Sequence, residues 1–255
     1  MKLYQTLLYE TDQQIATLTL NRPDQRNRLN QTMMAELKDA FLRLDQEEQV
    51  KIVILKAHGN YFCDGLDPYF VQQIQEYTFD QHVADSTFLA EIFMTIYRST
   101  KVLISQVEGE ANGIGAALLM VSDLVWATSK ASISFNEVKY GMIPAIAINF
   151  LLRKTGELRT KELLLSGESI PPSLAEAYHL INGTVQGDIQ TFVKQKAFQM
   201  AQQNSGASMQ LIKKMVADIQ EFPLERAMSF SAKMNAYART TAEGKIGLAK
   251  MGNSD

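Results

Sequence analysis

The segment from Lys101 to Ser129 constrains the fold more than any other part of the chain. An apolar run, Val102 to Val107, has the length of a buried strand, and a segment of small residues, Gly109 to Ala116, follows it. The apolar residues after Gly115 indicate a helix, and Leu124 to Ala127 indicate a further strand. Strand, glycine-rich turn, helix and strand in this order predict an α/β protein.

A helix that starts near Gly115 leaves its first backbone N–H groups unpaired, and such a terminus stabilises negative charge. One interpretation is a phosphate-binding turn, but the segment contains neither G-x-G-x-x-G nor GK[ST]. The other is an oxyanion site, in which N–H groups meet the oxygen of an enolate or alkoxide. Gly113 and Gly115 could instead serve only the close packing of the helix on a strand.

Length and charge exclude several classes of protein. A chain of 255 residues that is 46% hydrophobic can bury one large core with an appendage. One cysteine excludes an internal disulfide, and three scattered histidines form no metal-binding pattern, so we expect no metal site. A net charge of −3 without a basic stripe argues against nucleic acid. The absence of a signal-like N-terminus and of a long apolar run predicts a cytoplasmic protein without a membrane partner.

Four motifs resemble those of the enoyl-CoA hydratase/isomerase (crotonase) superfamily in order and spacing. They are Asn21-Arg22-Pro23, the F-x-x-G-x-D loop of Phe62 to Asp67, the V-x-G-x-x-x-G-x-G turn of Val107 to Gly115, and the strand and loop of Ser132 to Pro144. The resemblance covers essentially the whole chain. It implies an α/β crotonase-like spiral of ββα turns with a C-terminal helical oligomerisation region. Residues 1–187 form the core spiral and residues 188–255 the helical region.

The periodicity of apolar residues predicts the elements along the chain. Strands are expected over 3–9 and 14–21 around a Thr11-Asp12 turn, and over 51–57, 102–107, 124–127, 131–135 and 180–185. Helices are expected over 31–48, 68–77, 81–98, 145–154, 158–165, 172–178, 188–203, 206–221 and 223–242. The segments 61–67 and 136–144 are expected to be loops.

The resemblance implies which residues carry the chemistry. The backbone N–H groups of Leu66 and Ile114 polarise the carbonyl of an acyl thioester, and Gly65 and Gly113 lie in the turns that present them. Glu137 is the acid/base. Hydratases of the family carry a second glutamate in the helix after the glycine turn, and Ala117 stands at that position here.

Further residues are candidates for substrate binding, each with a structural alternative. Arg26 and Arg28 meet the phosphates of coenzyme A or an acidic carrier protein, or are solvated. Tyr69 and Phe70 line the acyl pocket or pack in the core. Tyr140 donates its hydroxyl in the pocket or is a core tyrosine bonded to backbone, and Asp67 contributes to the site or caps a helix.

Cys63 is the only thiol in the chain and lies beside the oxyanion loop. A nucleophilic role needs a base, and His58 is the only candidate. The alternative for Cys63 is a small buried packing residue.

A chain with Glu137 and no second glutamate is expected to be a lyase or isomerase of acyl thioesters. The leading hypothesis is dehydration of a branched 3-hydroxyacyl thioester, as in polyketide β-branching. Alternatives are double-bond isomerisation, decarboxylation, and a non-catalytic homologue that binds an acyl carrier protein. No cofactor is expected beyond the coenzyme A or phosphopantetheine of the substrate. The partners implied are acyl-CoA or an acyl carrier protein, and a homotrimer or a dimer of trimers.

Overall fold

Three successive ββα units build the core of the protein, and the computed structural model describes residues 4–252. In each unit the first strand joins a large sheet, the second joins a small sheet, and helices follow. The units are β3 (Ile52–Ala57), β4 (Tyr61–Asp64), α2 (Pro68–Ile74) and α3 (Phe79–Arg98); β5 (Val102–Val107), β6 (Glu110–Asn112) and α4 (Ile114–Met120); and β7 (Leu124–Thr128), β8 (Ser132–Ser134), η2 (Glu137–Tyr140) and α5 (Ala145–Ser166). The spiral of ββα turns expected from the resemblance is confirmed.

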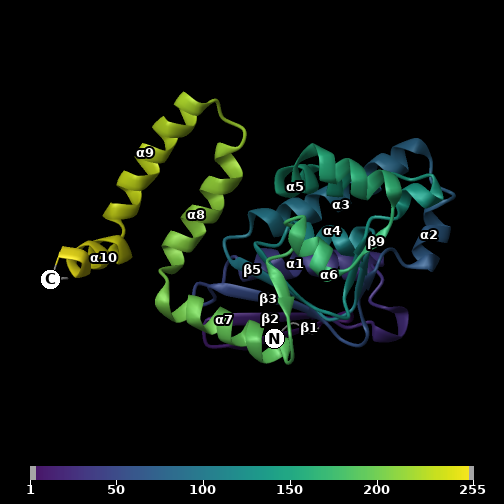
Figure 1. Ribbon diagram of the computed structural model, residues 1–255, viewed down its shortest axis with the longest axis horizontal. Coiled ribbons are helices and arrows are strands. Elements are labelled where there is room, and N and C mark those ends of the chain that lie inside the picture. Colours follow the sequence, from purple (N-terminus) through teal and green to yellow (C-terminus); the bar gives the residue numbers. More distant parts are fainter. Residues whose placement is uncertain (1–3, 253–255) are drawn as a thin grey trace.

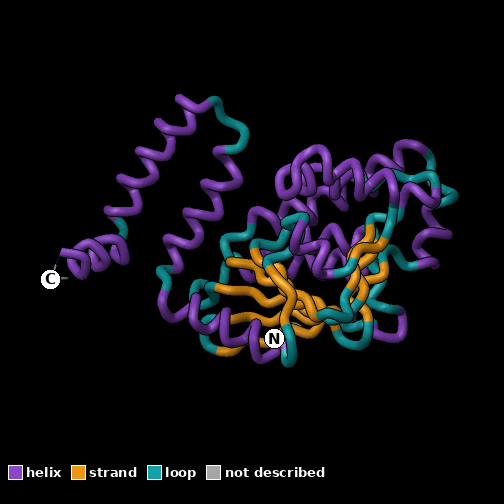
Figure 2. Tube along the Cα trace, viewed as in Figure 1, coloured by secondary structure: helices purple, strands orange, loops and turns teal. Residues whose placement is uncertain are grey.

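The strands form two sheets of different size (Figure 2), and most neighbouring strands in each sheet run parallel. The large sheet has the order β1-β2-β3-β5-β7-β10, with β1 (Leu7–Asp12), β2 (Ile15–Leu20) and β10 (Gly183–Val185). The small sheet has the order β4-β6-β8-β9, and only β9 (Ser169–Ile170) runs antiparallel in it. Because β4, β6 and β8 are parallel, the segments that follow them leave one edge of the small sheet together.

Apolar residues on both faces of the large sheet explain why it is buried. On one face, Val53 and Leu55 join the main core with the apolar stripe of α1 (Gln31–Leu44). On the other face, Ile52 and Ile54 pack under α7 (Ile189–Gln203). Strands that are buried on both faces have nearly continuous apolar sequences, and for this reason these strands could be predicted.

The C-terminal helices α8 (Gly206–Ile219), α9 (Leu224–Thr240) and α10 (Ala242–Gly252) extend away from the core (Figure 1). None of their described residues is buried. α7 precedes them and packs on the large sheet, and α6 (Pro172–Ala177) lies before β10. The division of the chain at residue 187 stays a prediction.

Several boundaries differ from those expected. The first hairpin turns at Gln13 and Gln14 rather than at Thr11-Asp12, because Gln13 adopts the left-handed φ of +53°; the start of that predicted strand lies outside the described residues. Residues 61–64 and 110–112 are strands rather than loop and turn, and residues 137–140 form a short 3₁₀ helix, as do Pro23–Gln25 (η1). The helices expected over 145–154 and 158–165 are joined in α5, with a kink between them at Gly156, whose φ of +72° is not helical.

No helix among the described residues combines the length and the apolar character that spanning a membrane requires.

Candidate active site

The first candidate oxyanion donor is the N–H of Leu66, in the turn between β4 and α2. Gly65 before it has a φ of +82°, which glycine adopts at little cost. Leu29 donates its N–H to the Gly65 carbonyl and accepts the N–H of Asp67, both at 2.9 Å. This parallel bridge directs the Leu66 peptide the other way. The Leu66 N–H has no acceptor among residues 4–252, so it can bind a ligand oxygen.

The second candidate donor is the N–H of Ile114, the first residue of α4. Gly113 before it has φ +53° and ψ −123°, a combination that essentially only glycine adopts. The N–H of Gly113 donates to the carbonyl of Ser134 at 2.8 Å and ties the turn to β8. First-turn N–H groups have no partner within their helix, and Ile114 has none elsewhere among the described residues.

The pairing of β4 with β6 brings the two donors together. Asp64 pairs with Asn112, and each stands two residues before a donor. Neighbouring strands lie about 4.8 Å apart. Two donors that each bind one oxygen at about 2.9 Å must lie within about 5.8 Å of each other. The parallel register therefore suits the two N–H groups to a single carbonyl oxygen.

Glu137 begins η2, three residues after the end of β8, and its carboxylate faces the glycine turn. A Cβ atom on Gly113 would lie 3.2 Å from Glu137 Oε1, so the carboxylate and the turn are in contact range. Burial raises the pKa of Glu137 above the usual glutamate value. Oε2 is buried without a hydrogen-bond partner in the described part of the chain. The raised pKa and the unpaired Oε2 suit this carboxyl group to exchange a proton with a ligand.

Ala117, at the position of the family's other glutamate, is buried in the first turns of α4 and offers no polar group. Its N–H donates to the carbonyl of Gly113 at 3.0 Å, an ordinary helical bond. Its methyl group lies in the main core, and the part of Ala117 in substrate binding stays a prediction.

Asp67 holds the loop of the first donor in place. Its carboxylate accepts the N–H of Tyr69 at 2.9 Å and forms an ion pair with Arg22 at 2.7 Å. Burial opposes ionisation, but the Arg22 guanidinium and the N–H groups at the start of α2 outweigh it and lower the pKa of Asp67. The predicted helix cap is confirmed; the part of Asp67 in substrate binding stays a prediction.

The two candidate arginines are neither free nor simply solvated. Arg28 binds Asp64 Oδ2 through Nε at 3.1 Å and through Nη2 at 2.7 Å. Arg26 approaches the same oxygen at 3.4 Å and stacks on the ring of Tyr61. About half of the Arg26 side chain (51%) is exposed against 29% for Arg28. The guanidinium group of Arg28 is thus held in an ion pair with Asp64. Arg26 remains the candidate for binding a phosphate of the thioester carrier.

The aromatic candidates divide between core and surface. Phe70 is buried in the main core, as the packing alternative predicts. Tyr69 is 70% exposed and Tyr140 is 75% exposed. The expectation that Tyr140 is a core tyrosine was wrong, because it ends η2 and points to solvent rather than into the core.

Cys63 is a packing residue. Its side chain is buried on the side of β4 that faces α4, where a Cβ atom on Gly115 would lie 2.8 Å from Sγ. Burial raises the pKa of the thiol to about 12. His58 bonds to Asn21 instead. The nucleophile hypothesis for Cys63 was therefore wrong, because a thiolate cannot form there near neutral pH.

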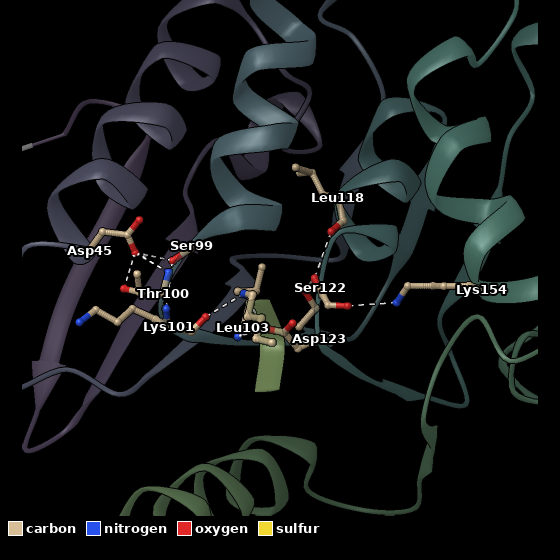
Figure 3. A network of polar contacts seen from close by, with 11 residues as sticks. Asp45, Ser99, Thr100, Lys101, Leu103, Leu118, Ser122, Asp123 and Lys154 are labelled. Atoms are coloured by element: carbon tan, nitrogen blue, oxygen red, sulfur yellow. Dashed lines mark hydrogen bonds and ion pairs between the residues drawn. The ribbon is translucent and has the colours of Figure 1, made fainter. Parts of the chain in front are cut away.

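A network of polar contacts holds the other end of α4 (Figure 3). The hydroxyl of Ser122 donates to the carbonyl of Leu118 at 3.0 Å, and Lys154 Nζ donates to the carbonyl of Ser122 at 3.0 Å. Asp123 accepts the N–H of Leu103 at 2.7 Å. These bonds pair the Leu118 carbonyl of α4 and attach the segment after the helix to β5 and α5.

Three residues near the donors, Asp64, Asn112 and Ser134, were not predicted to belong to the site. Asn112 Nδ2 donates to Asp64 Oδ1 at 2.8 Å, and the hydroxyl of Ser134 donates to Asn112 Oδ1 at 2.6 Å. They end β4, β6 and β8. Each lies two or three residues before a candidate catalytic group. A prediction that the three segments are neighbouring parallel strands would therefore have identified them.

Comparisons with known proteins agree with this geometry. The model of the enoyl-CoA hydratase/isomerase family matches residues 10–252. A Thermus thermophilus relative, provisionally named an enoyl-CoA hydratase, is 30% identical over 235 residues, 92% of each chain. The 2,3-dehydroadipyl-CoA hydratase of Escherichia coli K12 is 24% identical over 244 residues, 95% of this chain and 93% of that one.

A solved enoyl-CoA hydratase from Shewanella pealeana has a TM-score of 0.92 and 24% identity, over 97% of this chain and 93% of that chain. The hydratase structure from Mycobacterium smegmatis has a TM-score of 0.91 and 24% identity, over 96% and 95%. The chain therefore belongs to the enoyl-CoA hydratase/isomerase family of enzymes and has the crotonase fold.

Proposed function

We propose that this enzyme dehydrates a branched 3-hydroxyacyl thioester. Glu137 removes the proton from the carbon beside the thioester carbonyl, and the N–H groups of Leu66 and Ile114 stabilise the enolate oxygen. The bond between C3 and its hydroxyl oxygen then breaks, and the Glu137 carboxylic acid gives its proton to that oxygen, which leaves as water. The product is a 2-enoyl thioester, and no proton is gained or lost overall.

One observation carries the proposal: the half-buried carboxylate of Glu137 stands against the donor turn, and Ala117 supplies no second carboxylate from α4. A lone carboxyl group must both take the proton and deliver it. The proton and the hydroxyl group must therefore leave from the same face of the substrate. A raised pKa suits this double role, since it makes the carboxylate a stronger base and so helps it take the proton that it later delivers as an acid.

Double-bond isomerisation is the second candidate. The same observation favours it, since one carboxylate that removes a proton from C2 can return it to C4 of a 3-enoyl thioester. Decarboxylation and a purely binding role are weaker, because both leave without a task the carboxylate of Glu137, whose Oε2 is buried with no partner in the described chain.

The substrate is proposed to carry either coenzyme A or the phosphopantetheine of an acyl carrier protein. Arg26, half exposed beside the loop of the first donor, is the cation offered to a phosphate of either carrier. Tyr69, exposed at the start of α2, is the residue offered to the acyl or pantetheine chain. The proposed chemistry uses no further cofactor.

The protein is proposed to act as a homotrimer or a dimer of trimers in the cytoplasm. Large apolar side chains of the C-terminal helices are exposed, among them Ile212, Leu224, Met228 and Ile246. Such surfaces are typical of interfaces between subunits. Light scattering coupled to size exclusion measures the assembly, and a monomer would contradict this part of the proposal.

The test of the activity is intact-mass spectrometry of 3-hydroxy-3-methylglutaryl groups offered on coenzyme A and on an acyl carrier protein. We expect loss of one water from at least one carrier. Glu137→Gln should slow the loss by roughly 10²- to 10⁴-fold. Glu168→Gln, which alters an exposed carboxylate, is the matched control and should keep the rate of the parent protein.

The outcomes separate the candidates. Conversion of a 3-enoyl thioester to its 2-enoyl isomer, without dehydration of any hydroxyacyl group, would contradict the dehydratase and establish an isomerase. Loss of carbon dioxide from the dehydrated thioester would establish a decarboxylase. Binding of the thioester with no turnover in the parent protein would establish a binding module.

A further inference from the structure

Asp64, Asn112 and Ser134 form one continuous row of hydrogen bonds across three parallel strands. Asp64 pairs in register with Asn112, and Asn112 pairs with Ser134. The bonds measure 2.8 Å from Asn112 Nδ2 to Asp64 Oδ1 and 2.6 Å from Ser134 Oγ to Asn112 Oδ1. We name this row of three side chains the polar ladder.

Each member of the ladder is the last residue of its strand and stands just before a candidate catalytic group. Asp64 and Asn112 lie two residues before Leu66 and Ile114, and Ser134 lies three residues before Glu137. On the opposite face, the preceding residues, Cys63, Ala111 and Ile133, are buried in the core. The ladder thus spans the edge from which both donors and the acid/base emerge.

Backbone pairing alone holds this edge weakly. β6 and β8 have three residues each, and the pairing of β4 with β6 is irregular between Tyr61 and Cys63. Beyond the strand ends, the bond from the Gly113 N–H to the Ser134 carbonyl ties the donor turn of β6 to β8. The spacing between the donors therefore depends on what joins the strand ends, and the ladder supplies two links that involve ordered, partly buried groups.

The charge of the ladder is balanced. Asp64 carries a negative charge close to a site that must stabilise an enolate. Arg28 binds its Oδ2 through two nitrogens, and Arg26 approaches it at 3.4 Å. Glu110 Oε2 also lies 3.2 Å from Asn112 Nδ2, so two guanidinium groups face two carboxylates at this edge and their charges balance. The carboxylate can therefore anchor the strands without opposing the negative charge that develops on the substrate.

We infer that Asp64, Asn112 and Ser134 are positioning residues that set the separation of the Leu66 and Ile114 N–H groups and their distance from Glu137. The inference rests on the proposed function, since it assigns a purpose to the proposed donors. The ladder acts through the backbone and touches no substrate. Its loss should therefore lower kcat and the polarisation of the bound carbonyl, with little change in KM.

The test uses cinnamoyl-CoA, whose absorbance shifts to longer wavelength when its thioester carbonyl is polarised. Glu137→Gln serves as the parent so that the probe is not turned over. Asn112→Ala in this parent should lose most of the shift while binding the probe with similar affinity. In the otherwise natural enzyme, the same change should lower kcat by roughly 10²-fold.

Two further variants make the result specific. Glu110→Ala removes the other carboxylate near Asn112 Nδ2, 3.2 Å away on the exposed side, and should keep the full shift. Ser134→Ala deletes a single hydroxyl group and replaces Asn112→Ala if that variant does not fold. It should lose part of the shift for the same reason.

A full shift in both Asn112→Ala and Ser134→Ala would overturn the positioning role and leave the proposed function intact. No shift in the Glu137→Gln parent would overturn both, because the donors would then not bind a thioester carbonyl. A shift in the parent that falls in the ladder variants and is kept in Glu110→Ala supports the inference.

Discussion

Glu137 Oε1 lies 3.2 Å from the point where a Cβ atom on Gly113 would stand. The carboxylate of the candidate acid/base thus occupies the space that a side chain on the donor turn would take. The φ of +53° and ψ of −123° favour glycine at position 113, and a Cβ atom there would also press on the Glu137 carboxylate. The conformation of the turn at Gly113 and the position of the Glu137 carboxylate therefore depend on each other.

Gly113→Ala should therefore cost both stability and activity. The backbone strain is worth about 1–3 kcal/mol of unfolding free energy, and displacement of the carboxylate should lower kcat by roughly 10²-fold or more. Gly187→Ala is the control, since Gly187 has φ +89° with nothing within 4 Å. Denaturant titration and turnover measure the two effects. Equal loss of activity in both variants would contradict the contact with Glu137 as the cause.

The raised pKa of Glu137 makes a prediction for stability against pH. Because the folded pKa is raised by burial, this group favours the folded state below its unfolded pKa, and that contribution is lost as pH rises through the folded pKa. Glu137→Gln removes the ionisable group, so the variant does not lose this stability as the pH rises. The variant should melt at a higher temperature than the parent at about pH 7 and show a smaller difference at about pH 4. An advantage that grows toward acid pH would contradict burial as the source of the shift.

The thiol of Cys63 should be inert in the folded enzyme. Burial raises its pKa to about 12, so almost no thiolate forms at neutral pH. Iodoacetamide should label the denatured protein and leave the native one unmodified, as read by intact mass. Cys63→Ala should keep the turnover of the parent and lose about 1–2 kcal/mol of stability through the small cavity. Rapid labelling of Cys63 in the native protein, with loss of activity, would instead support the hypothesis that Cys63 is a nucleophile.

Lys213 ties the first exposed helix of the C-terminal region to the core. Its ammonium group lies 2.7 Å from Asp123 Oδ2 and 2.8 Å from the carbonyl of Lys101, and its side chain is only 11% exposed. Lys213→Gln should weaken this attachment by about 1.5–3 kcal/mol. Hydrogen exchange of the α8 amides should accelerate in this variant but not in Lys214→Gln, which alters the exposed neighbour. Unchanged exchange in both would show that other contacts hold α8.

The sequence predicts the large sheet and most helices because their patterns are strong. β3 and β5 are long apolar runs buried on both faces, and α1 shows a clear apolar stripe. β4 and β6 escaped because strands of four and three residues with small or polar members carry no readable periodicity. The small sheet exists through pairing between distant segments, which no local pattern encodes.

The candidate site also contains residues that the sequence predicts and residues that it does not. The positions of Leu66, Ile114 and Glu137 follow from motifs, since glycine turns and a strand end have fixed spacings. The commitment of Arg28 to Asp64 and the exposure of Tyr140 depend on which side chains meet in space. Asn112 and Ser134 read as unremarkable polar residues until the parallel register brings them side by side.

The parallel pairing of β4, β6 and β8 also decides when during folding the site can appear. Residues 61–64, 110–112 and 132–134 must pair across intervening segments that contain helices and further strands, and closing each segment has an entropic cost before any contact offsets it. Helices and the first hairpin form from near neighbours and need no such search. A nascent or refolding chain therefore acquires thioester binding only after most of its helical content. Any chain that ends before residue 137 lacks the proposed acid/base, however well its earlier turns have folded.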